Sequence, residues 1–533
     1  MERSAGTIDG LHSSATKDAT GNAASHRANY SATALYLVIA FVAARVFLYL
    51  FFGPQYGYFR DEMYYLACGR HLQWSYVDQP PLWPWVAWLL EHSIGTSLYA
   101  LRFASMLGGV AAIVLTARMA YEFGARRTGI WLAALAALCA PLYLMMAHLF
   151  TMNAIDPALW AACALVAIRA HKSGNDRLWL VFGALVGITV LNKYGILFFV
   201  AAFLVAMLFT DWRKHLASRW LWLGALLGAA IDFPSFMWQA RNHYPFLELM
   251  RHVRDSGRDI KLPPLGFMSQ QIQMMHPIGF LLVFAALAFF FTRRGREFRV
   301  FGLTYVIFVD ALMILGAKNY YVGPIYTIMF AAGAVAVEQW FATRTRWVPT
   351  AYAVVLVITT AILMPIILPV LSPMKYVAYA NTMHLAPPKF ENQRQGPLPQ
   401  LYADMFGWED KVRLVAKYFQ ALPADERAKT AIYANNWGDA AAFEFFGPKY
   451  GLPQPISPHQ TYWIWGPRGY TGESLLVVDE DDPKHLASLC ESVTLAADIN
   501  HPLARPDSNI PAYHCRRLKS DLRALWPRIK HYD

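Results

Sequence analysis

The stretch YFRDEMYYLACGRHLQWSYVDQPPLWPW, from Tyr58 to Trp85, follows directly after the first long apolar segment of the chain. It contains three acidic residues, eight aromatic residues and the paired prolines Pro80 and Pro81. Carboxylates near a membrane cost desolvation energy, whereas aromatic rings are favoured at the interface. We therefore expect this stretch to lie rigidly along a membrane surface, with Asp61 and Glu62 in a functional role.

A structural role is the alternative for the acids of this stretch. Asp61 could cap a short helix, and Asp78 could begin the turn that precedes the two prolines. A helix cap needs only one carboxylate, so the second acid of the Asp61–Glu62 pair favours a function in addition to capping.

Outside this stretch, long apolar segments alternate with short polar loops. Apolar residues make up 56% of the sequence, and the mean hydropathy is positive although the last third is polar. This composition is typical of a polytopic membrane protein with a soluble portion. A transmembrane helix needs about 20 mostly apolar residues. The eleven expected helices lie near 32–52, 98–119, 129–147, 153–170, 178–192, 195–210, 220–238, 275–292, 299–316, 322–341 and 348–371.

The net charge of +11 is carried by the N-terminal part, mostly in alternate short loops. Residues 372–533 contain 18 Lys and Arg against 18 Asp and Glu, so the tail is neutral. Basic loops of membrane proteins stay in the cytoplasm, and a charge of this origin argues against nucleic-acid binding. With an odd number of helices, the tail and the loops at 58–85 and 239–274 are expected outside the cytoplasm. The basic loops contain Arg126, Arg127, Arg169, Lys172, Arg177, Arg213, Lys214, Arg219, Arg293, Arg294, Arg296, Arg299, Arg344 and Arg346.

The composition divides the chain into three parts. Residues 1–30 are rich in Ser, Ala and Gly and are expected to form a disordered cytoplasmic head without a cleaved signal peptide. Residues 31–371 are expected to form an all-α membrane domain whose first external loop spans 53–97. Residues 372–533 are expected to form a small α/β domain in the periplasm, after a linker that contains Pro387 and Pro388.

Helical and strand patterns alternate in this tail. Helices are expected at 411–422, 439–446 and 483–492, and strands at 430–434, 462–465 and 474–478. Cys490 and Cys515 are the two cysteines of the tail, and thiol pairs persist as disulfides in an oxidising compartment. We expect them to be bridged. Two free thiols are the alternative, because a sequence does not give their separation in space.

In this topology, five loops that are distant in sequence bring polar groups to one membrane surface. A carboxylate with cationic neighbours there suits transfer of a group from a lipid phosphate. The carboxylate accepts a proton from the acceptor hydroxyl, and Lys or Arg stabilises the leaving phosphate. As alternatives, Lys193 and Lys318 could snorkel and Asp156 could cap a helix. The groups outside the first loop are His148, Asn153, Asp156, Lys193, Tyr194, Arg241, Asn242, His243, Lys318, Asn319, Tyr320 and Tyr321.

The segment RDEMYYLACGRHLQWSYVDQPPLWPW resembles the first external loop of bacterial glycosyltransferase family 39. This family belongs to the GT-C class, which includes protein O-mannosyltransferases and the lipid A aminoarabinose transferase. The resemblance continues in GALVGITVLNKYGILFF, FPSFMWQARNHYPF and AKNYYVGPIYTIMF, and in YANNWGDAAAFEFFGPKYGLP of the tail. The acidic pair with Asp-Gln-Pro-Pro-Leu is its most specific part.

This resemblance implies a bacterial inner-membrane enzyme that transfers a sugar, with inversion, from a polyisoprenyl-phosphate donor. The implied acceptor is lipid A, another envelope glycolipid or a protein hydroxyl on the external face. Asp61 is implied as the base, Glu62 as its partner or a metal-contacting neighbour, and Asp156 as a second acid of the site. Members differ in their use of a divalent cation, so a metal stays open. The candidate donor-binding residues are Lys193, Tyr194, Arg241, Lys318 and Tyr321.

Two other classes of function are compatible with many apolar helices. A polytopic transporter or lipid flippase favours broken helices and charges near the middle of the bilayer, without an acidic loop and a soluble domain on one face. A non-catalytic assembly protein could use the tail to recruit partners. The sequence contains no glycine-rich nucleotide motif and no Cys/His spacing typical of a zinc site.

Overall fold

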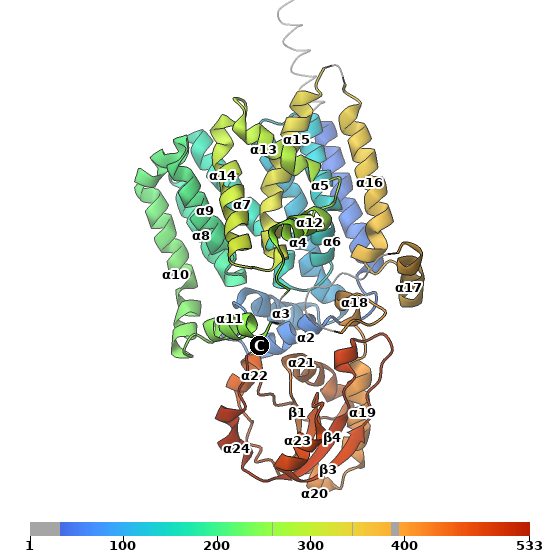
Figure 1. Cartoon of the computed structure of the whole chain (residues 1–533). Coiled ribbons are helices and arrows are strands. Elements are labelled where there is room, and N and C mark those ends of the chain that lie inside the picture. The colour runs from blue at the N-terminus through green and yellow to red at the C-terminus, as the bar shows by residue number, and fades with distance from the viewer. Residues whose placement is uncertain (1–31, 258–259, 344, 385–393, 533) are drawn as a thin grey trace, which may run out of the picture.

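The computed structural model describes residues 32–257, 260–343, 345–384 and 394–532 (Figure 1). A helical bundle lies above a small α/β domain, and short helices form a layer between them. The expected disordered head at 1–30, Arg344, and Pro387 and Pro388 of the linker lie outside the described residues.

Each of the eleven expected segments contains at least one helix of the bundle. Six helices of the described chain are long and apolar enough to cross a membrane, or seven if one bent pair counts as a span. The expected all-α membrane domain is confirmed, and the count of eleven spans stays a prediction. The helices are Ala32–Phe52, α4 (Leu98–Glu122), α5 (Arg127–Cys139), α6 (Pro141–Met146), α7 (Asp156–Ser173), α8 (Leu178–Asn192), α9 (Ile196–Leu208), α10 (Arg219–Arg241), α13 (Leu281–Phe291), α14 (Arg299–Ile314), α15 (Tyr326–Trp340) and α16 (Val348–Ile367).

Small residues let two of these helices approach closely. Gly183 and Gly187 of α8 face Gly224 and Gly228 of α10, and a methyl group at any of the four would collide with the backbone of the opposite helix. Glycines spaced four residues apart form such contacts between membrane helices. The centre of the bundle is α15, whose residues 326–336 are all buried.

The expected interfacial stretch forms two helices, α2 (Arg60–Arg70) and α3 (Leu82–Ser93), which lie between the bundle and the tail (Figure 1). The loop at 239–274, which the sequence predicts to be external, is likewise helical, with α11 (Pro245–Ser256) and α12 (Pro264–Met274). Two short helices, α17 (Pro373–Thr382) and α18 (Gln400–Ala403), lead into the tail. The 3₁₀ turns are η1 (Met152–Ala154), η2 (Asp211–Ala217), η3 (Arg296–Phe298), η4 (Asn319–Ile325), η5 (Gly447–Tyr450), η6 (Pro506–Ser508) and η7 (Trp526–Arg528).

The tail is an α/β domain, as the alternation of patterns predicts. Its sheet has the order β1-β2-β4-β3, with β1 parallel to β2 and the other pairs antiparallel. The strands are β1 (Thr430–Ala434), β2 (Ser474–Val478), β3 (Cys490–Ala497) and β4 (Ala512–Leu518). The helices are α19 (Trp408–Ala421), α20 (Ala424–Lys429), α21 (Trp437–Phe446), α22 (Gln460–Trp465), α23 (Pro483–Leu489) and α24 (Leu522–Leu525).

The strand expected at 462–465 is wrong, because these residues belong to the helix α22. The rings of Tyr462 and Trp465 lie 4.6 Å apart, whereas Trp463 donates a hydrogen bond to the carbonyl of Trp526 at 2.9 Å. Residues three apart share one face of a helix but point to opposite faces of a strand. The packing of these large rings therefore overrides their strand propensity.

The helix expected at 483–492 is too long. It ends at Leu489, and Cys490 begins the edge strand β3. Only the first and last residues of β3 are buried, so the strand lacks the alternation of buried and exposed positions by which a sequence reveals a strand. The expected bridge between Cys490 and Cys515 is confirmed, with the two Cα atoms 5.7 Å apart on neighbouring strands. In the chain-entropy view, closing a loop of this length stabilises the fold by about 3 kcal/mol.

The helix α2 packs directly on the tail domain. Met63, Tyr64 and Cys68 of α2 share one buried apolar cluster with Ile432 of β1 and Phe443 of α21. Polar contacts join the same surfaces. The Tyr64 hydroxyl lies 2.9 Å from Thr461 Oγ1, and the Arg60 guanidinium lies 4.5 Å from the centre of the Trp437 ring. The tail is thus part of the support for the stretch at 58–85.

Candidate active site

Glu62 is held by a buried ion pair. Its carboxylate receives two hydrogen bonds from Arg102 of α4, with Nε at 2.9 Å and Nη2 at 3.0 Å, and both side chains have 0% exposure. The backbone N–H groups of Phe59 and Phe150 also donate to it, at 2.8 and 2.9 Å. Four donors leave little capacity for another partner. Glu62 therefore fastens α2 to α4 and to the hairpin that precedes α7.

Arg102 extends this junction to the start of the loop at 53–97. Its guanidinium donates to the carbonyls of Gly53 and Gly57, and it lies 3.4 Å from Nε2 of the buried His148. Burial and the nearby positive charges of Arg102 and Arg45 hold the pKa of His148 well below its usual value. His148 is therefore neutral near pH 7 and acts as an acceptor within this junction.

Asp61 is adjacent in sequence but differs in its surroundings. Its side chain is 35% exposed, and Oδ1 lies 3.7 Å from Nε of Arg60. One residue along a helix rotates the side chain by about 100°, because a turn has 3.6 residues. The buried Glu62 anchors α2, and this rotation leaves Asp61 accessible. Of the two acids, Asp61 has the exposure that a general base needs.

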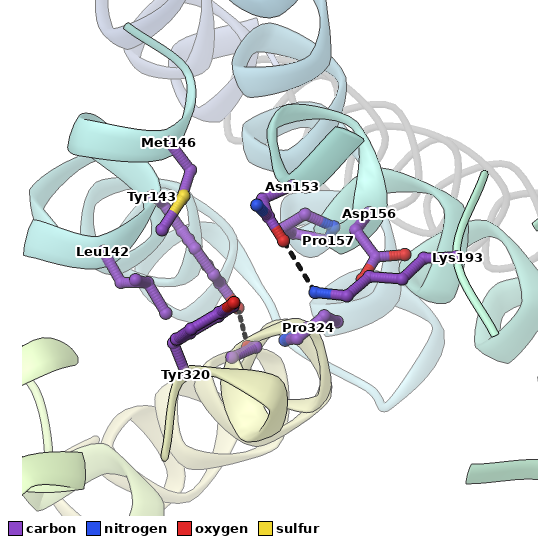
Figure 2. Close-up of a pocket in the computed structure, with 10 residues that line it drawn as sticks. Leu142, Tyr143, Met146, Asn153, Asp156, Pro157, Lys193, Tyr320 and Pro324 are labelled. Atoms are coloured by element: carbon purple, nitrogen blue, oxygen red, sulfur yellow. Dashed lines mark hydrogen bonds between the residues drawn. The ribbon is translucent and has the colours of Figure 1, made fainter. Parts of the chain in front are cut away.

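A small cavity lies between α6, the start of α7, the turn that follows α8, and η4 (Figure 2). Its volume is about 20 Å³, which accommodates a water molecule. A sugar phosphate therefore requires side chains to move. The lining residues are Leu142, Tyr143, Met146, Asn153, Asp156, Pro157, Lys193, Tyr320, Gly323 and Pro324.

Lys193 is the cation of this cavity. Its Nζ donates to Asn153 Oδ1 at 2.6 Å and lies 5.0 and 4.4 Å from the ring centres of Tyr320 and Tyr321. Figure 2 shows Asp156 beside it. Burial lowers the pKa of Lys193 to about 8, and the Asp156 carboxylate opposes this shift. The amine is therefore mainly charged at neutral pH.

Asp156 begins α7 and is buried. Its Oδ1 lies 3.4 Å from Nδ2 of Asn192, which also donates to the carbonyl of Met152 at 3.0 Å. The end of α8 is thus joined to the hairpin before α7. This junction places the Asp156 carboxylate next to Lys193, and the role of Asp156 as a second acid of the site stays a prediction.

The predicted residues do not all meet in one cavity. Lys193 and Asp156 line it, and Tyr321 covers the Lys193 amine from η4. Lys318 precedes η4 and acts on Lys193 electrostatically, lowering its pKa further. Asp61 lies outside the cavity on α2, whose Tyr65 hydroxyl accepts a hydrogen bond from the N–H of Met152 in the hairpin.

Tyr194 and Arg241 lie elsewhere. The ring of Tyr194 packs against Phe246 of α11, with centroids 4.7 Å apart, on a different surface from Lys193. Arg241 is exposed at the end of α10, and within the described chain it forms no ion pair or hydrogen bond. The roles of both residues in donor binding stay predictions.

Arg102 and Asn192 are site supports that the sequence-based reasoning did not single out. A charge inside the apolar segment at 98–119 is a signal for Arg102, because such charges are expensive in a membrane and need a partner. Asn192 has no comparable signal. Among the described residues, no three His, Cys, Asp or Glu side chains gather as metal ligands. The arrangement of these side chains does not fit a metal site, and we assign no step of the reaction to a metal ion.

The sequence and the fold of the chain are similar to those of known glycosyltransferases. Residues 78–238 match the family described as dolichyl-phosphate-mannose-protein mannosyltransferase. The fold is similar to that of ArnT from Cupriavidus metallidurans bound to undecaprenyl phosphate, with a TM-score of 0.58 and 16% identity over 90% of this chain and 97% of ArnT. These matches support the GT-C class of membrane glycosyltransferases that the sequence resembles. The resemblance seen in the sequence is confirmed.

Two further comparisons agree with this class. The chain is 24% identical over 252 residues to the lipid A galacturonosyltransferase RgtD of Rhizobium johnstonii (strain DSM 114642 / LMG 32736 / 3841). The match covers 46% of this chain and 52% of RgtD, so it spans about half the length of that curated relative. The apo state of ArnT from Cupriavidus metallidurans gives a TM-score of 0.57 with 15% identity, over 90% of this chain and 98% of that one. At these identities the likeness to ArnT concerns the fold.

Proposed function

We propose that this glycosyltransferase moves a sugar from a polyisoprenyl phosphate to a hydroxyl of the cell envelope, with inversion at the sugar carbon. The observation that carries the proposal is Lys193, a charged amine held beside Asp156 and two tyrosine rings in a cavity at the α2 end of the bundle. A cation is needed there, because the departing lipid phosphate develops negative charge.

The chemistry follows from the two kinds of residue. The acceptor oxygen forms the new bond to the sugar carbon as the bond to the phosphate oxygen breaks, and the acceptor proton passes to Asp61. The phosphate leaves with the bonding electrons and stays anionic, so it needs Lys193 and no general acid. Asp156 holds the Lys193 charge in place. The Glu62 carboxylate accepts four hydrogen bonds, so it positions α2 and does not act as a second base.

The acceptor that we favour is lipid A or another envelope glycolipid, with a protein hydroxyl as the second candidate. The sequence match to RgtD, a lipid A galacturonosyltransferase, supports a glycolipid acceptor. The match to the dolichyl-phosphate-mannose-protein mannosyltransferase family supports the protein alternative. The structure of ArnT with undecaprenyl phosphate supports a polyprenyl carrier as the donor lipid.

The test of this function is an assay with purified protein, radiolabelled polyprenyl-phosphate sugars and an envelope extract. Label in lipid A, in another glycolipid or in protein identifies the acceptor. A transporter or flippase moves the labelled lipid between leaflets of a vesicle and leaves the sugar on its carrier, which would contradict the proposal.

We place the active site on the periplasmic face of the inner membrane. The basic loops support this orientation, and so does the bridge between Cys490 and Cys515, since disulfides persist in oxidising compartments. A reporter enzyme that is active only in the periplasm, fused after Asp533, is expected to be active. A reporter that is active only in the cytoplasm should be silent at the same position, and a signal from it would reverse the orientation.

Replacing Lys193 by Ala is expected to raise KM for the lipid-phosphate donor about tenfold or more, because a charged hydrogen bond to phosphate is lost. In the unmodified enzyme, kcat/KM should fall as the pH rises through about 8, where Lys193 loses its proton. Lys193→Arg should retain activity to higher pH, since a guanidinium stays charged. The matched control is Lys417→Ala, at an exposed position of α19. An unchanged donor KM in Lys193→Ala would remove this residue from the site.

A further inference from the structure

A second hollow lies at the end of the bundle opposite the tail domain, where α9 turns into η2 and η3 leads into α14 (Figure 1). Its volume is about 250 Å³, more than ten times that of the cavity at Lys193. The residues that matter for its chemistry are Leu208, Phe209, Asp211, Arg213, Arg296 and Arg299.

Three arginines from two separate segments line this hollow. Within the described chain, Arg213, Arg296 and Arg299 form no ion pair, and Asp211 is the sole carboxylate of the lining. Nε of Arg299 is buried and has no hydrogen-bond partner among the described residues. A buried N–H group without an acceptor costs free energy. The hollow therefore has an excess of positive charge and one donor that lacks an acceptor.

Three other basic residues at this end of the bundle are paired within the protein. Arg118, Arg169 and Lys172 all contact the carboxylate of Glu122, at 2.9, 3.4 and 2.8 Å. The positive-inside rule accounts for basic residues in these loops. The positive-inside rule does not account for three guanidiniums without ion pairs around one hollow. Such a cluster is typical of an anion-binding site.

The walls of the hollow continue into the apolar surface of the bundle. Leu208 and Phe209, at the end of α9, are 57% and 73% exposed. Phe291, at the end of α13, lies with its ring centre 5.9 Å from the Arg299 guanidinium and is also exposed. A ligand with a phosphate and attached hydrocarbon chains can contact the arginines and these apolar side chains together.

We propose that this hollow binds the headgroup of an anionic phospholipid, with the phosphate between Arg213, Arg296 and Arg299 and the acyl chains along Leu208, Phe209 and Phe291. Guanidiniums bind phosphate oxygens in a bidentate geometry, and basic pockets between membrane helices bind acidic lipid headgroups. The site lies at the opposite end of the bundle from Lys193, and it does not depend on the reaction proposed above.

Native mass spectrometry of the full chain in detergent tests the site. Phosphatidylglycerol and cardiolipin are titrated separately, with phosphatidylcholine as the zwitterionic reference. Anionic lipid should bind at least tenfold more tightly than phosphatidylcholine, and Arg213→Gln/Arg296→Gln/Arg299→Gln should remove most of this preference. The matched control is Arg126→Gln/Arg127→Gln/Arg346→Gln, which removes the same charge from exposed positions outside the hollow. This control should keep the preference for anionic lipid.

Equal binding of anionic lipid by the two triple variants would overturn the proposal, because charge at this end of the bundle would then act without a specific site. Inorganic phosphate separates the two sources of the anion. Displacement of the lipid by millimolar phosphate would indicate a free-phosphate site and also overturn the proposal. Retention of the lipid supports it. A thermal melt of each variant shows whether the fold is intact, and Arg299→Gln alone provides a milder test with a smaller loss of preference.

Discussion

Replacing Asp61 by Asn is expected to reduce turnover by about 10² or more, while the protein folds and inserts normally. The amide has the shape of the carboxylate but does not accept the proton of the acceptor hydroxyl. The Asp61 side chain is 35% exposed, so the change should cost little stability. Turnover is measured with saturating lipid-phosphate donor, beside a thermal melt in detergent.

A second acid, Asp156, makes this result decisive. Asp156→Asn should chiefly weaken donor binding, because Asp156 stabilises the charge of Lys193. If Asp61→Asn keeps full activity and Asp156→Asn abolishes turnover at saturating donor, the base is Asp156 and our assignment is wrong. Activity that survives at both positions would contradict carboxylate catalysis at this site.

Replacing Glu62 by Gln is expected to destabilise the protein by about 3–5 kcal/mol, because Arg102 is left buried without its counter-charge. The loss affects the helix Arg60–Arg70, α4 and the hairpin at Phe150 together, since all three meet at this carboxylate. A lower Tm and less protein in the membrane fraction are the expected readouts.

A matched control separates this effect from a simple loss of charge. Glu409→Gln removes a carboxylate from an exposed ion pair with Lys449 in the tail, and exposed pairs contribute little to stability. Its Tm should stay near that of the unmodified protein. A Glu62→Gln variant that is stable and inactive would indicate that Glu62 acts in the chemistry, as its partner role with Asp61 implies.

Much of the fold follows from local patterns. The apolar segments could be predicted from their length, and the strands β1 and β2 from their runs of apolar residues. The bridge between Cys490 and Cys515 could be predicted from the expectation that the tail faces an oxidising compartment. The segment at 462–465 could not, since its aromatic residues favour a strand and only contacts with distant segments make it helical.

For the site, the sequence predicts which residues lie at one end of the bundle but not which way their side chains point. Topology brings Asp156, Lys193 and Tyr321 to one end of the bundle, and they meet there. It does not reveal the direction of each side chain. Tyr194 follows Lys193 directly but points to α11, and Glu62 follows Asp61 but is sealed against Arg102. Adjacent residues of a turn or a helix face different surroundings, which tertiary packing determines.

The shared core of α2 and the tail has a consequence for biosynthesis. Tyr64 and its hydrogen-bond partner Thr461 are separated by 397 residues. At a translation rate of roughly 5–20 residues per second, the ribosome needs about 20–80 s to synthesise that interval. During this time the segment that carries Asp61 has left the ribosome but lacks the surface on which it packs. The nascent enzyme should therefore become active only after the tail has been synthesised and has folded. Chains that terminate early in the tail should be inactive and should be degraded by proteases.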